Sequence, residues 1–252
     1  MSNREAFLTR VRRAAEQGRQ YRVHLQAVPA DVGYVGAGDD LVQRFCEEAT
    51  AVGGQTFVVS DVEGARVKLR ELLDNSKAQS AVCWRHEVLE RVGLGSLVAE
   101  ASIEALDYNR LQVLPAEEGR ARLLACDVGI TSCEAAIAET GTLMMCSGPG
   151  QERLASLIAP VHIAIIERRQ IVADLIDAFA MLMTNDEARQ MTNDQATMTK
   201  QISNLKSQIG SLPSNVTFIT GPSKTGDIEL QLTTGVHGPG VWQVIVIDEA
   251  AD

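Results

Sequence analysis

Short runs of apolar, largely β-branched residues recur along the sequence, and several of them are separated by segments with helical spacing. The helical patterns cover residues 40–52 and 62–73. The apolar runs read as strands at residues 55–61, 80–84, 110–115, 143–147, 162–167, 215–220 and 241–248. Apolar residues are nearly continuous within these runs, which is typical of strands buried on both faces of a parallel sheet. The pattern therefore predicts an α/β fold, with a layered, mostly parallel sheet flanked by helices.

Length and composition favour one main folded domain. The chain has 252 residues, of which 45% are hydrophobic, so it can bury a sizeable core. Residues 1–30 are predicted to form an N-terminal helical arm, because Phe7, Leu8 and Val11 recur at helical spacing. Residues 31–252 are predicted to form the α/β domain.

Charge and hydropathy limit the classes of partner and the cellular compartment that are expected for this chain. The formal net charge of −10 repels phosphate backbones, so nucleic acid is not expected as a partner. The longest apolar run, residues 154–166, is shorter than the roughly 18 residues of a membrane span. The basic N-terminus lacks the apolar core of a secretory signal. We therefore expect a cytoplasmic protein without a membrane span.

The cysteines are expected to be reduced thiols that bind no metal. They are Cys46, Cys83, Cys126, Cys133 and Cys146, and no two of them form a CxxC pair. Structural zinc sites and iron–sulfur clusters usually need more closely spaced ligands. The sequence therefore predicts no intrinsic cofactor and no metal site in this chain.

A capping-box spacing occurs in the middle of the chain. Thr131 is followed three residues later by Glu134, and the stretch from there to Ala138 is rich in alanine. This combination predicts a short helix that begins after Thr131.

The turn that follows contains Glu139, Thr140 and Gly141 and leads into the strand at residues 143–147. Glu139 is either a solvated turn residue or a group that points into a cleft as a base, nucleophile or ligand contact. In the second case Thr140 and Gly141 would lie beside the ligand.

A second unusual turn follows the strand at residues 215–220. Gly221 ends the strand, and Thr225 is a fair N-cap with Asp227 in the first helical turn. The bare backbone N–H groups of residues 223–226, at the start of this helix, would bind a phosphate or a carboxylate, and Lys224 would add a positive charge. The alternative is a well-capped turn with an exposed lysine.

A third unusual turn places His237 between glycines and before a proline. Such a histidine is exposed and suited to hydrogen bonding or proton transfer near neutral pH, or else it bonds a backbone carbonyl. We hypothesise that Glu139, Lys224 and His237 meet in one cleft, in which Glu139 and His237 act as catalytic groups. In contrast, His162 lies in an apolar run and is expected to be a core or strand-end residue.

Four segments in this order resemble the LUD domain of the lactate utilization protein C family (LutC, also called YkgG). They read DVGITSCEAAIAETGTL, LIAPVHIAII, ITGPSKTGDIE and GVHGPG, and the resemblance is strong over residues 127–248. A departure is the Met- and Asn-rich segment 183–208, which looks longer and more helical than the loop expected there.

The resemblance implies a fold like that of ribose-phosphate isomerase, glucosamine-phosphate deaminase and the CoA-transferases. It also implies a component of an L-lactate dehydrogenase complex that oxidises L-lactate to pyruvate. The partners would be one iron–sulfur protein and one cysteine-rich protein, so the clusters would lie outside this chain. This subunit would bind a small anionic metabolite. Two alternatives stay open: a stand-alone enzyme acting on a sugar phosphate or an acyl-CoA, and a non-catalytic scaffold subunit.

Overall fold

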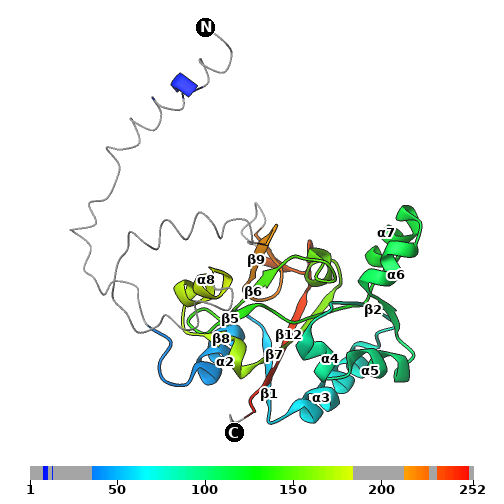
Figure 1. Ribbon diagram of the computed structural model, residues 1–252, viewed down its shortest axis with the longest axis horizontal. Coiled ribbons are helices and arrows are strands. Elements are labelled where there is room, and N and C mark those ends of the chain that lie inside the picture. Colours follow the sequence, from blue (N-terminus) through cyan, green and yellow to red (C-terminus); the bar gives the residue numbers. More distant parts are fainter. Residues whose placement is uncertain (1–7, 11–12, 14–35, 184–212, 227–231, 250–252) are drawn as a thin grey trace, which may run out of the picture. The chain divides into compact units, whose positions relative to one another are not determined.

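A computed structural model describes residues 8–10, 13, 36–183, 213–226 and 232–249 (Figure 1). Internal contacts divide the chain into Met1–Val35 and Gly36–Asp252. Within the first unit, the described residues 8–10 and 13 are helical. The rest of the fold described below lies in the second unit.

The second unit is built on a six-stranded sheet in which every neighbouring pair of strands is parallel. Its strands, in spatial order, are β1 (Gln55–Val59), β12 (Val241–Ile247), β7 (Val161–Glu167), β4 (Val128–Thr131), β2 (Ser80–Cys83) and β3 (Glu104–Leu106). The central strands are largely buried, and Ile163, Ile165 and Ile245 have no exposed surface. The prediction of a largely parallel sheet in an α/β fold is confirmed.

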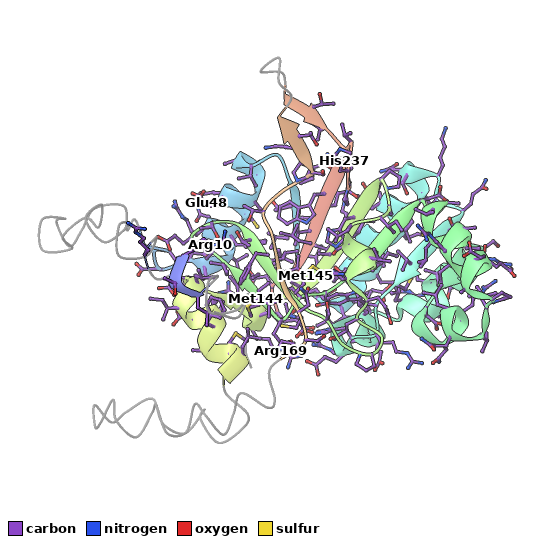
Figure 2. The ribbon with its side chains drawn as sticks, turned by 90° about the horizontal axis from the view of Figure 1, so that it is seen from above. Arg10, Glu48, Met144, Met145, Arg169 and His237 are labelled. Carbon is purple, nitrogen blue, oxygen red and sulfur yellow. The ribbon has the colours of Figure 1, made fainter. Side chains whose placement is uncertain are left out.

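A smaller four-stranded sheet packs beside the first. Its order is β8 (Ile171–Val172), β5 (Ala135–Ile137), β6 (Thr142–Cys146) and β9 (Val216–Ile219). Strand β6 contributes to two cores, because Met145 packs in the main cluster whereas Met144 packs in a second cluster with Ala178 (Figure 2). A separate antiparallel hairpin joins β10 (Lys224–Gly226) to β11 (Leu232–Thr234).

Helices cover the sheets. They are α2 (Leu41–Ala51), α3 (Val62–Ser76), α4 (Glu87–Arg91), α5 (Leu94–Glu100), α6 (Tyr108–Val113), α7 (Ala116–Leu124) and α8 (Leu175–Met183), with 3₁₀ turns at Arg153–Ser156 and Arg168–Gln170. Figure 1 shows α3, α4 and α5 together on one side of the large sheet, while α2 and α8 lie beside the small sheet. Helices α6 and α7 lie beyond β2, on the side of the sheet that ends in β3 (Figure 1).

Local signals explain the helices that the sequence predicted. Asp40 caps α2 by accepting from the backbone N–H groups of Val42 and Gln43, both at 3.1 Å. Asp61 caps α3 in the same manner through Gly64 N–H, at 2.7 Å. The helices expected over residues 40–52 and 62–73 are therefore present.

Two elements predicted within residues 110–138 are wrong. The strand expected at residues 110–115 is helix α6, because Asp107 caps it by accepting from Arg110 N–H at 2.8 Å. The helix expected after Thr131 is instead strand β5, whose residues are fully buried between β6 and β8. Burial and strand pairing there outweigh the helical preference of alanine.

Two sequence predictions remain, one on the Met- and Asn-rich segment and one on membrane spans. Apart from Met183, which ends α8, the Met- and Asn-rich segment 183–208 lies outside the described residues. Over the described ranges, no helix combines the length and the hydropathy that crossing a bilayer requires.

Candidate functional site

A cavity of about 300 Å³ lies at the amino-terminal ends of β7 and β12. Its wall is formed by β9 with the turn that follows it, by the loop before β12, and by the first residues of β7 and β12. Larger hollows of about 640 and 480 Å³ lie elsewhere in the fold. The 300 Å³ cavity is the candidate site because it gathers Gly221, Ser223, Lys224 and His237, all of which the sequence singled out.

Backbone hydrogen bonds hold the two loops of this cavity together. Ser223 N–H donates to Pro239 O at 2.8 Å, and Gly235 N–H donates to Ser223 O at 2.9 Å. Gly240 N–H donates to Pro160 O at 2.9 Å, which ties the His237 loop to the start of β7. Gly238 permits the contact, because a Cβ there would lie 3.1 Å from the Cβ of Ser223.

Lys224 has a structural partner as well as a place on the cavity wall. Its ammonium donates to Val52 O at 2.6 Å, at the carboxyl end of α2. A cation at this position is favoured, since the last carbonyl groups of a helix carry partial negative charge. An ammonium has three protons, so Lys224 retains two for a ligand.

The prediction of a helix beginning near Thr225 is wrong. Residues 224–226 form β10, and Thr225 pairs with Thr233 of β11. Strand pairing across the hairpin therefore replaces the row of free helix-start N–H groups that was expected to bind an anion. Thr225 does not line the cavity, and Asp227 lies outside the described residues.

His237 lines the cavity and is itself exposed. Figure 2 shows it beside the hairpin, while Arg169 lies towards the other end of the parallel strands. His237 and Lys224, two of the three groups in the shared-cleft hypothesis, are thus on one wall.

The third group is not on that wall: neither Glu139 nor the adjacent Thr140 and Gly141 lines the cavity. Glu139 is half-buried, and its N–H donates to Ala173 O at 3.1 Å. Gly141 has φ +60°, and a Cβ there would lie 2.2 Å from the backbone nitrogen of Ala49 in α2. The turn therefore serves as a close packing contact with α2.

A chain of hydroxyl groups connects this turn with the cavity. Thr140 Oγ1 lies 2.7 Å from Thr142 Oγ1, which lies 2.8 Å from Thr220 Oγ1. Thr220 is part of the cavity wall. The turn thus supports the wall from behind.

Sequence reasoning did not select two further residues of the wall, His162 and Trp242. They are partners in the register of β7 and β12, so their side chains lie next to each other on one face of the sheet. His162 is fully buried, and its Nε2 lies 2.8 Å from Thr131 Oγ1. Burial lowers the pKa of His162 to about 3, so the imidazole is neutral at physiological pH.

His162 is thus a core histidine, as expected, but only one of its nitrogens is bonded. Its Nδ1 and the Nε1 of Trp242 have no hydrogen-bond partner among the described residues. The available sequence signal was a histidine near the start of one apolar strand and a tryptophan near the start of a later one. Its meaning depends on strand register, which the sequence did not reveal.

The opposite edge of the large sheet carries a cluster of ion pairs. Glu167, at the carboxyl end of β7, is buried and pairs with Arg91 and Arg169. Arg169 also pairs with Glu87 at 2.6 Å. Ligands of open α/β sheets usually bind at this carboxyl edge. Here the charges of the cluster are paired with one another, so it is interpreted as structural.

Burial raises the pKa of all five cysteine thiols. Burial raises the pKa of Cys83 to about 12 and that of Cys146 to about 11, so both remain thiols at neutral pH. Across the described residues, no group of three or more His, Cys, Asp or Glu side chains is arranged to hold a metal ion.

Comparison with known proteins decides the family, because the model of the LUD domain matches residues 42–247. This protein belongs to the LUD domain family. Lactate utilization protein C of Shouchella clausii (strain KSM-K16) is 30% identical over 259 residues, covering 99% of each chain. Lactate utilization protein C of Bacillus subtilis (strain 168) is 28% identical over 259 residues, covering 99% of this chain and 98% of the other.

A solved structure has a similar fold. The crystal structure of a DUF162 family protein from Deinococcus radiodurans superimposes with a TM-score of 0.52 at 20% identity. The match covers 82% of this chain and 96% of the other. At this identity the likeness establishes the fold alone.

Within this LUD domain, the sequence segments that carried the resemblance have distinct structural roles. ITGPSKTG and GVHGPG each contribute some of the residues that line the cavity, and PVHIAII supplies His162. The segment AETGTL instead packs on α2.

Proposed function

We propose that this protein takes part in lactate utilization, as a subunit of a system that oxidises L-lactate to pyruvate. The observation that carries the proposal is the 30% identity to lactate utilization protein C of Shouchella clausii, over 99% of both chains. A match over the whole of each chain supports a shared role better than a match to one motif would.

The partners in this proposal are an iron–sulfur protein and a cysteine-rich protein. Electron transfer from L-lactate requires redox groups, and the described residues of this chain present no cluster of metal ligands. In this proposal the iron–sulfur clusters belong to a partner, and this subunit binds a small anion.

The cavity is the proposed anion site. Lys224 supplies positive charge, Ser223 supplies a hydroxyl group, and His237 supplies an imidazole that can donate a hydrogen bond or transfer a proton. Glu139 does not line the cavity, so no role in binding is proposed for it.

Deletion of the gene in the organism that carries it tests the proposal. We expect the deletion strain to lose growth on L-lactate while growing normally on pyruvate, because only the oxidation step is missing. The gene supplied on a plasmid should restore growth. Unchanged growth of the deletion strain on L-lactate would refute a role in its oxidation.

Two alleles in the same strain separate binding from scaffolding. His237→Ala should fail to restore growth, whereas Val236→Ala should restore it, because Val236 is exposed and does not line the cavity. Full restoration by His237→Ala, with normal protein levels, would favour a non-catalytic scaffold.

A further inference from the structure

Two buried side chains on the cavity wall each carry a polar atom without a hydrogen-bond partner among the described residues. These atoms are Nδ1 of His162 and Nε1 of Trp242, in residues with 0% and 1% exposed surface. Buried polar groups are almost always hydrogen-bonded, and an unbonded one destabilises the fold. Because both atoms belong to residues of one cavity wall, a molecule held in that cavity is the natural partner.

Both atoms can act as donors at the same time. An indole nitrogen donates and never accepts. The neutral imidazole of His162 has one protonated nitrogen, and its Nε2 lies 2.8 Å from the hydroxyl oxygen of Thr131. When Thr131 donates to Nε2, the proton of His162 lies on Nδ1. In that tautomer the two side chains present two donors, which match a ligand with acceptor atoms.

The rest of the wall favours a negative charge. None of the described residues that line the cavity is Asp or Glu, although the chain has a formal net charge of −10. Lys224 lines the same cavity, and one of its three protons is used by Val52 O. The wall therefore combines donors with a positive charge.

Size and apolar surface restrict the ligand further. A volume of about 300 Å³ is at the small end of ligand sites, too small to enclose a dinucleotide or coenzyme A. Leu157, Phe218 and Ile219 give the wall an apolar part. A short organic acid satisfies both properties.

We propose that His162 and Trp242 bind the carboxylate of a short 2-hydroxy or 2-oxo monocarboxylic acid in this cavity. Lys224 adds charge, and Ser223 and His237 are on the wall to bond the hydroxyl or keto oxygen of the adjacent carbon. This inference rests on the proposed function and deepens it, because L-lactate and pyruvate belong to this class of acids.

The two tryptophans of the chain provide a direct test with an internal control. In a ¹H–¹⁵N spectrum of the full chain, each indole N–H gives one signal, and the Trp84→Phe variant assigns them. Trp84 Nε1 already donates to Glu152 O at 2.9 Å, and Trp84 does not line the cavity. Titration with L-lactate or pyruvate at constant ionic strength should shift the Trp242 signal downfield to saturation and leave the Trp84 signal in place.

A pair of lysine variants tests the charge. Lys224→Met should weaken binding of L-lactate by at least tenfold. Lys68→Met should leave binding unchanged, because Lys68 pairs with Glu71 on α3 and does not line the cavity. Equal binding by both variants would contradict the assigned role of Lys224.

Two results would overturn the inference. If inorganic phosphate or glucose 6-phosphate shifts the Trp242 signal and neither organic acid does, the site recognises phosphate and not carboxylate. If no compound shifts it, the cavity holds none of these ligands. Absence of binding together with loss of growth on L-lactate would refute this inference alone. Binding together with unchanged growth of the deletion strain would refute the proposed function alone.

Discussion

Burial of His162 affects the stability of the protein as well as its cavity. The pKa of this imidazole is about 3 in the folded chain, against an ordinary value of 6.5. Between these values the unfolded chain binds a proton that the folded chain does not. The free energy of unfolding therefore decreases as the pH falls below about 6.5, and the loss ends near the folded pKa of about 3.

We predict that His162 contributes up to about 1.4 kcal/mol of lost stability per pH unit between pH 6 and pH 5. Urea unfolding at pH 7, 6 and 5 measures the effect, in a range where most carboxylates stay ionised. His162→Gln, which does not titrate, should show a smaller slope. Equal slopes for the two proteins would mean that His162 does not stay neutral in the fold.

At the scale of elements, the contact between the β5–β6 turn and α2 is very close. The Gly141 position has φ +60°, and a Cβ there would lie 2.2 Å from Ala49 N and 2.6 Å from the carbonyl carbon of Glu48. Both neighbours belong to the backbone of a helix, which cannot yield as a side chain can. Figure 2 labels Glu48 on this helix.

Gly141→Ala should therefore lower the free energy of unfolding by about 2–4 kcal/mol, from overpacking and the left-handed backbone. Gly95→Ala is the matched control, since Gly95 lies in the exposed part of α5 with open space around its Cβ position. This control should gain up to about 1 kcal/mol. Urea denaturation measures both, and a Gly141→Ala protein as stable as the wild type would show that the contact is loose.

At the scale of the whole molecule, we propose that residues 31–252 fold without residues 1–30. Internal contacts separate Met1–Val35 from the remainder, and the LUD domain match covers residues 42–247. A chain beginning at Asp31 should unfold cooperatively, within about 1 kcal/mol of the full chain, because its core is intact.

A chain beginning at Gly54 is the contrasting case, because it lacks α2 with the fully buried Phe45 and Ala49. We expect it to lose cooperative unfolding. Circular dichroism during thermal or urea unfolding compares the three proteins. Failure of the Asp31 chain to fold would assign the first thirty residues to the core.

The elements of the fold that could be predicted are those whose signals are local. The apolar runs that became β1, β7 and β12, and the capped helices α2 and α3, each carry their pattern within a few residues. The predictions were wrong where pairing with another segment of the chain determined the local structure. Residues 135–137 became a strand between β6 and β8, and residues 224–226 paired with β11.

The difference between local and long-range signals also separates two groups of residues in the candidate site. The sequence alone identified Lys224 and His237, because both lie among glycines and prolines and such residues are typical of turns. The pairing of His162 with Trp242 depends on the register of β7 and β12, whose paired residues are eighty positions apart in the sequence. Hydrophobic periodicity determines which segments become strands, but only long-range packing decides which strands are neighbours, and therefore which residues line a common cavity.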